Sequence, residues 1–468
     1  MNAAVLLALG LLMVPSRYLS VEVDIDWEPG RRVTTVAYTA VAGDDGRFMR
    51  VSRDFDPDYM EVELIRGEYG FPGSTREVPG WAVDSLTGSP GWPRALVAAF
   101  PGLRPGMTMN WTFRVTDTGP FSSQGLFYTY IAGEEPDTII VRCREYDGLS
   151  WHAAGFTQRE DGDQVVFISA GEDFRELWLS TASDWAEVDS ILMNSSREAS
   201  AVVPPDLREA SIEAGAAGAL PRMRISRGRV LITESMQLQG FPGGDAGFQV
   251  RSIQEILDTR RATPIEAATL LTAMCRVMGM EASVVPSTDI HPPIPTPLGF
   301  HRAFVLVDGL LEEPSEYLSP VGWVDTEDTL WLLLPGGTLA ELPPETSQEI
   351  CREDWTVSPD EGRFSLLVTA SGGYDRELRR RLAGLDDEEM LLRVAEWLRA
   401  SGVHFFPDTL IVSDFYDLTE TASMEVSGFI ARFPGPWAER TPSLLWNRDG
   451  VVNRTCNGSV PAGRLIIR

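Results

Sequence analysis

The residues that could perform nucleophilic or metal chemistry are few and widely separated. The chain of 468 residues contains four cysteines and four histidines. A thiol nucleophile needs a histidine within reach to take its proton, and the candidate pair is Cys275 with His291 or His301. Because the sequence has no CxxC pair and no HExxH motif, its spacing predicts neither a metal site nor a bound cofactor.

The charge of the chain limits its partners. Aspartate and glutamate total 68 residues against 40 basic residues, which gives a net charge of -28. Nucleic-acid binding needs clustered cations on a surface, so we expect no nucleic-acid partner. All basic residues are arginines, and an arginine cannot serve as an amine nucleophile or form a Schiff base at ordinary pH.

The sequence predicts the start of one helix from a clear capping signal. Thr263, Pro264 and Glu266 fit a capping box with proline at the first helical position. Apolar residues then recur at helical spacing up to Gly279, which is a natural stop. Cys275 falls on the apolar side of this helix, so we expect it to be a small core residue.

The order of local patterns divides the rest of the chain. Short runs of β-branched and aromatic residues, separated by turn formers, fill residues 18–182 and predict an antiparallel β-sandwich. Residues 183–342 mix helical patterns with strands. Residues 343–468 predict a small, mainly β domain with one helix at residues 386–402. We therefore expect an α+β protein.

Residues 1–17 have the character of a possible signal segment. They contain the apolar run AAVLLALGLLMV, which is too short to cross a hydrocarbon core of about 30 Å as a helix. Such a run matches the apolar part of a secretory signal. We expect export to the periplasm, cell surface or exterior, and no transmembrane span beyond this segment.

Three stretches of the central segment together carry a resemblance to a known family. EAATLLTAMCRVMGMEASVV, FHRAFVLVDG and EEPSEY occur in this order, which is similar to the core of the transglutaminase-like superfamily. In that family a cysteine opens the helix, a strand with His-Ala-Trp-Val follows, and then Asp-Pro-Thr. The resemblance implies a papain-like α+β core. The strand-rich segment before it, with FPGLRPGMTMNWTFRV, resembles a sandwich domain of unknown function that precedes this core in bacterial envelope proteins.

The resemblance places other residues at all three chemical positions. Pro264 stands at the cysteine, Arg302 at the histidine and Glu313 at the aspartate. Proline has no nucleophile, and arginine is no general base near neutral pH. We expect an ion pair between Arg302 and Glu313 inside the remnant cleft, beside the helix N-terminus. His301 is expected to face away from it, and Cys275, 11 residues beyond Pro264, lies about 16 Å further along the helix.

These observations favour a catalytically inactive transglutaminase-like protein of the envelope or exterior, which acts in binding or assembly with a protein, peptide or glycan partner. One alternative is an active cysteine-dependent protein-glutamine acyltransferase or peptidase that uses Cys275 with His301 or His291. Another is a carboxylate-based hydrolase, which would draw on a group of acidic residues: Glu312, Glu313, Asp325, Glu327 and Asp328.

Overall fold

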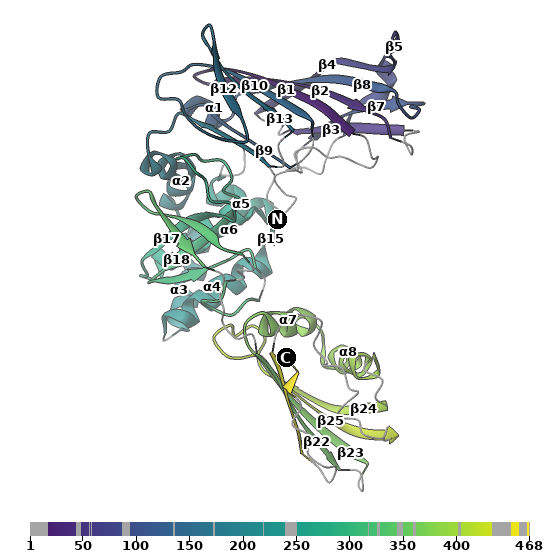
Figure 1. Cartoon of the computed structure of the whole chain (residues 1–468). Coiled ribbons are helices and arrows are strands. Elements are labelled where there is room, and N and C mark those ends of the chain that lie inside the picture. Colours follow the sequence, from purple (N-terminus) through teal and green to yellow (C-terminus); the bar gives the residue numbers. More distant parts are fainter. Residues whose placement is uncertain are drawn as a thin grey trace.

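The chain is an α+β protein with several separate sheets (Figure 1). The computed structural model describes most of the chain, and the ranges are 17–43, 48–55, 57, 59–86, 94–133, 136–171, 174–218, 220–238, 250–316, 318–324, 328–343, 350–358, 362–400, 404–432, 451–457 and 466–467. The possible signal segment therefore lies almost wholly outside the described residues. Within them, no helix is both long and apolar enough to span a bilayer.

The N-terminal part consists of sheets joined by short connections. Its largest sheet has eight strands, in the order β12 (Thr157–Asp161), β13 (Gln164–Ala170), β10 (Thr138–Arg144), β1 (Arg17–Glu28), β2 (Arg31–Val41), β8 (Thr108–Asp117), β4 (Met60–Phe71) and β5 (Ser74–Glu77). Two three-stranded sheets accompany it: β11 (Ser150–Ala154), β14 (Arg175–Ser180) and β9 (Phe127–Ala132), and β3 (Phe48–Phe55), β7 (Arg94–Pro101) and β6 (Val83–Leu86). The short elements are η2 (Gly80–Ala82) and α1 (Pro120–Gln124).

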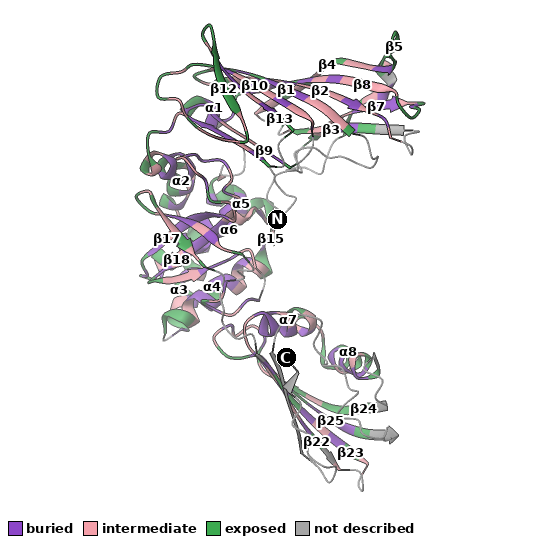
Figure 2. Cartoon of the chain, viewed as in Figure 1, coloured by how far each residue is buried: buried purple, intermediate pink, exposed green. Residues whose placement is uncertain are grey.

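Alternation of apolar and polar residues builds this part. Along β2 and β8 every second side chain is buried, as expected for strands with one face on a core. Tyr38 and Trp111 stack with ring centroids 5.1 Å apart inside that core. One expectation needs correction: the sheet is not wholly antiparallel, since β1 pairs parallel to β10. The edge strand β12 is exposed throughout and is green in Figure 2.

The central part combines helices with a five-stranded sheet. The helices are α2 (Trp185–Ala201), α3 (Pro205–Ala216), α4 (Pro221–Ser235), α5 (Ile253–Thr259) and α6 (Pro264–Val277). The sheet order is β19 (Leu310–Glu312), β18 (Arg302–Val307), β17 (Ala282–Thr288), β20 (Leu330–Leu334) and β21 (Thr338–Leu342), and a separate short ladder joins β15 (Gln237–Leu238) to β16 (Arg261–Ala262). Helix α6 is central to the packing, because every residue from Ile265 to Cys275 is buried.

The C-terminal part packs two helices on a six-stranded sheet. The strands are β24 (His404–Val412), β25 (Ser423–Arg432), β23 (Arg363–Ala370), β22 (Ile350–Ser358), β26 (Val451–Asn457) and β27 (Ile466–Ile467), and the helices are α7 (Gly373–Leu382) and α8 (Asp387–Ala400). The prediction of a single helix here is wrong. Helix α7, GYDRELRRRL, starts without a side-chain cap, and its apolar stripe is limited to three buried residues at helical spacing, Tyr374, Leu378 and Leu382, so its sequence signal is short.

Polar contacts join the three parts in series. The Ser180 hydroxyl donates to the Pro295 carbonyl, which links the N-terminal and central parts. The Leu418 amide donates to the Ser226 hydroxyl at 3.1 Å, and Arg376 of α7 pairs with Glu316 at 3.0 Å. These two contacts hold the C-terminal part against the central one.

Candidate functional site

The N-terminus of α6 forms as the sequence predicts. Pro264 occupies the first helical position, and the Glu266 amide donates to the Thr263 hydroxyl at 3.4 Å. In return, the Thr263 amide donates to the Glu266 carboxylate at 2.9 Å. The helix ends after Val277, and Gly279 follows in the left-handed region with φ of 79°. The start is therefore rigid, and no nucleophile stands at Pro264.

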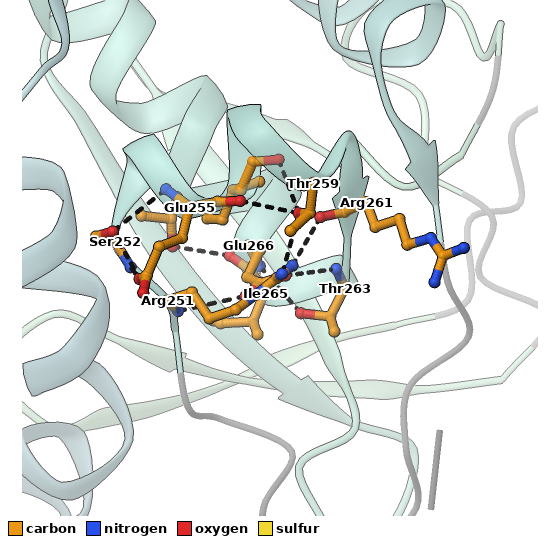
Figure 3. A network of polar contacts seen from close by, with 10 residues as sticks. Arg251, Ser252, Glu255, Thr259, Arg261, Thr263, Ile265 and Glu266 are labelled. Carbon is orange, nitrogen blue, oxygen red and sulfur yellow. Dashed lines mark hydrogen bonds and ion pairs between the residues drawn. The ribbon is translucent and has the colours of Figure 1, made fainter. Parts of the chain in front are cut away.

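A second residue, which the sequence did not suggest, also holds the Glu266 carboxylate. Arg251 binds it through two guanidinium nitrogens, at 2.7 Å from Nε and 2.9 Å from Nη2 (Figure 3). The same guanidinium donates to the Arg261 carbonyl at 2.7 Å and to the Thr259 hydroxyl at 3.0 Å. Glu266 is only 2% exposed, so this charge is buried and fully engaged. The start of α6 thus carries a buried carboxylate held by a partly exposed arginine.

The ion pair expected between Arg302 and Glu313 is present. Arg302 Nη2 lies 2.6 Å from Glu313 Oε2, and Nε lies 3.1 Å from Oε1. This is the bidentate geometry that arginine makes with a carboxylate. Burial raises the pKa of Glu313 above its ordinary value, and Arg302 opposes that rise only in part.

The pair does not lie where we expected it. In β18, Ala303, Val305 and Val307 pack in the core that contains α6, whereas Phe304 belongs to a smaller core on the other face of the sheet. The Arg302 guanidinium stands over the Phe304 ring, 5.0 Å from its centroid. Arg302 therefore shares the face of Phe304, which is turned away from the body of α6. The reason is strand alternation, because successive side chains point to opposite faces.

His301, the fallback base, has both ring nitrogens beside acceptors. Nδ1 is 2.9 Å from the Gly299 carbonyl, and Nε2 is 3.6 Å from an Asp289 carboxylate oxygen. A catalytic histidine uses one nitrogen to bind an orienting group and leaves the other for the nucleophile. Here Nδ1 is engaged by a backbone carbonyl, and Nε2 stands beyond hydrogen-bond distance of a carboxylate rather than beside a thiol. His291, the other candidate, packs on the Trp331 ring with centroids 4.0 Å apart.

Cys275 is a core residue, as the sequence predicts. Its exposed fraction is 0%, and it packs in the cluster that contains α6. Burial, with a smaller contribution from Glu312, raises the pKa of the Cys275 thiol to about 12. Cys143 and Cys351 are also buried. A thiolate nucleophile needs the opposite environment, exposed and electropositive.

The carboxylates proposed for a hydrolase do not form an open pair. Glu312 is buried against Arg229 at 3.1 Å and accepts from the Gly322 amide at 2.7 Å, and its neighbour Glu313 is held by Arg302. Asp328 is exposed, while Asp325 and Glu327 lie outside the described residues. Among the residues that the structure describes, no group of three or more histidine, cysteine, aspartate or glutamate side chains could hold a metal ion.

Comparison with known proteins supports the fold but no activity. No family model and no curated protein matches the sequence. Among solved structures, a crystal structure titled "a putative protease" from Parabacteroides distasonis matches with a TM-score of 0.60 and 13% identity, over 89% of this chain and 93% of that one. At this identity the likeness shows a shared fold alone. An M1 zinc metallopeptidase from Deinococcus radiodurans matches with a TM-score of only 0.22 and 14% identity, over 36% of this chain and 43% of that one, which is too distant to support an argument.

Proposed function

We propose that the chain is a transglutaminase-like protein without the catalytic triad, which acts in binding or assembly in the envelope or outside the cell. In this proposal its parts are an N-terminal β-sandwich, a papain-like core and a small C-terminal domain. The observation that carries it is the N-terminus of α6. The resemblance gives this place to a thiol, but it holds Pro264 and the ion pair of Arg251 with Glu266.

The other two positions replaced in the sequence support the loss of the triad through their residue types, although their pair lies on the sheet face turned away from the body of α6. In the sequence, Arg302 and Glu313 occupy the positions at which the family has a histidine and an aspartate. The Arg302 guanidinium makes two hydrogen bonds to the Glu313 carboxylate. Such a pair fixes the local structure but offers no proton acceptor to a substrate. The fold can therefore persist as a shape while its chemistry is lost, which is the situation of a binding or assembly module.

The cysteine-dependent alternative is favoured by one observation only, the approach of His301 to Asp289. It would give this chain the histidine and carboxylate of a triad. None of the three cysteines whose side chains are described supplies the third member, because all are buried. The alternative of a carboxylate-based hydrolase is not favoured, because Glu312 and Glu313 are each bound to an arginine instead of facing a substrate as an open pair.

The activity half of the proposal is tested with two assays on the full chain: incorporation of a fluorescent primary amine into casein glutamines, and release of dye from labelled casein. We expect wild type, Cys275→Ala and His301→Ala to match a buffer blank in both. Turnover by wild type that either substitution abolishes would instead establish the cysteine-dependent enzyme.

The binding half needs a separate measurement. Labelled wild-type protein is applied to peptide and glycan arrays, with heat-unfolded protein as the control. We expect retention of the folded chain on one ligand class. Equal retention of folded and unfolded protein on every class would contradict a binding role.

A further inference from the structure

A cavity in the helical layer of the central part has no role in the site described above. It is about 290 Å³ in volume and lies between α3, α4, α5 and α6. Its floor is apolar and buried, and consists of Leu207, Ile232, Met236, Leu270 and Met274. Pro264, Arg302 and Glu313 do not line it, so a role for this cavity is independent of the proposed function.

The size of the cavity indicates what it can hold. A cavity of about 150 Å³ with apolar walls accommodates benzene, and ligand pockets begin at about 300 Å³. The space found here therefore fits an apolar body of about two fused rings or a short alkyl chain. Two floor residues, Met236 and Met274, have flexible thioether side chains that can adapt to such a body.

The rim of the cavity carries negative charge. Asp206 of α3 and Asp258 of α5 both line it and are exposed to solvent. Gln254 Nε2 donates to an Asp258 carboxylate oxygen at 2.9 Å, so both side chains lie at the same part of the rim. An apolar body that enters would place its polar end near two exposed carboxylates, with no arginine among the described residues that line the cavity.

We propose that this cavity, between α3, α4, α5 and α6, is a binding site for a small amphipathic cation, an apolar body that carries one ammonium group. The body fills the floor, and the ammonium lies between Asp206 and Asp258. A neutral or anionic ligand of the same shape gains only the apolar contacts or is repelled. Selection for positive charge is thus the property that distinguishes this site from a simple packing gap.

The test uses calorimetric titration of the full chain with three probes of one shape: 1-(aminomethyl)naphthalene, 1-naphthalenemethanol and 1-naphthoic acid. We expect the amine to bind about fivefold or more tightly than the alcohol, in keeping with weak attraction at exposed carboxylates. The acid should bind least. Higher salt should reduce the preference for the amine.

Three variants separate the parts of this argument. Asp206→Asn with Asp258→Asn should remove the preference for the amine, whereas Glu209→Gln, an exposed position on α3 outside the lining, should keep it. Ala210→Phe, at a half-buried lining residue, should fill the space and abolish binding of all probes. Circular dichroism checks that each variant is folded. Equal affinity for amine and alcohol in wild type, or unchanged binding in Ala210→Phe, would overturn the proposal.

Discussion

Two arginine–glutamate pairs in the central part have the same bidentate geometry but different surroundings. Glu266, at the start of α6, accepts from Arg251 and also from the Thr263 backbone amide. Glu313, which follows β19, takes its hydrogen bonds from Arg302, and burial raises its pKa. A helix N-terminus supplies amides and a favourable dipole to a carboxylate, whereas the end of a strand supplies neither. The second carboxylate therefore depends more on its arginine.

The largest effect is expected from Arg302→Met. It leaves Glu313 buried without its principal donor, which should cost about 3 kcal/mol of local stability at pH 7. Hydrogen exchange of the β17 and β18 amides, followed by mass spectrometry, measures this cost.

The cost should depend on pH in a defined direction. Loss of Arg302 raises the pKa of Glu313 further above the value in the unfolded chain. The penalty is then full above the folded-state pKa and diminishes as the pH falls through it. The control is Arg302→Met with Glu313→Gln, which should show no such dependence. A cost in the single variant that is constant with pH would contradict the assignment.

Arg251→Met should have a smaller effect, about 2 kcal/mol, although Glu266 is more deeply buried than Glu313. The Thr263 amide and the helix dipole still serve the carboxylate, and Arg251 is itself partly exposed. Protection of the first amides of α6 against exchange measures it. Arg227→Met, at an exposed position on α4, is the matched control. An effect of Arg251→Met larger than that of Arg302→Met would reverse the comparison.

Thr263→Ala should cost about 1 kcal/mol, because it removes one half of the capping box and leaves the Glu266 half in place. Thr263→Ser keeps the hydroxyl and should lose little. The same α6 amides report the difference. Equal loss in the two variants would show that the hydroxyl is unimportant.

The last prediction concerns reactivity rather than stability: the buried Cys275 thiol should react slowly. With its pKa raised to about 12 by burial, the thiol should react with iodoacetamide at pH 8 about 100-fold or more slowly than in the unfolded chain. Labelling of the peptide that contains Cys275, with and without urea, measures the ratio. Similar rates in both conditions would show that this part of α6 opens readily.

Sequence reasoning succeeded where the signal is local. The capping box from Thr263 to Glu266 spans four residues, so the start of α6 could be predicted without any tertiary contact. Arg251 is 15 residues from Glu266 and reaches it only after α5 and β16 have folded back, so no pattern pointed to it. The partnership of Arg302 with Glu313 came from the family resemblance. Which face it occupies depends on two cores that pack on opposite sides of β18, and no single strand encodes that.

The parallel pairing of β1 with β10 has a consequence for how the protein folds during its synthesis. Strand β1 lies between β2 and β10 in the eight-stranded sheet, and its residues Ser20 to Ile25 pair with Thr138 to Cys143. On the ribosome, β1 can pair with β2 at once, but its other edge must wait until more than a hundred further residues have been synthesised. An unpaired strand edge can form hydrogen bonds with a strand of another chain, which leads to aggregation. We therefore expect the nascent chain to expose this edge of β1 until β10 has been synthesised.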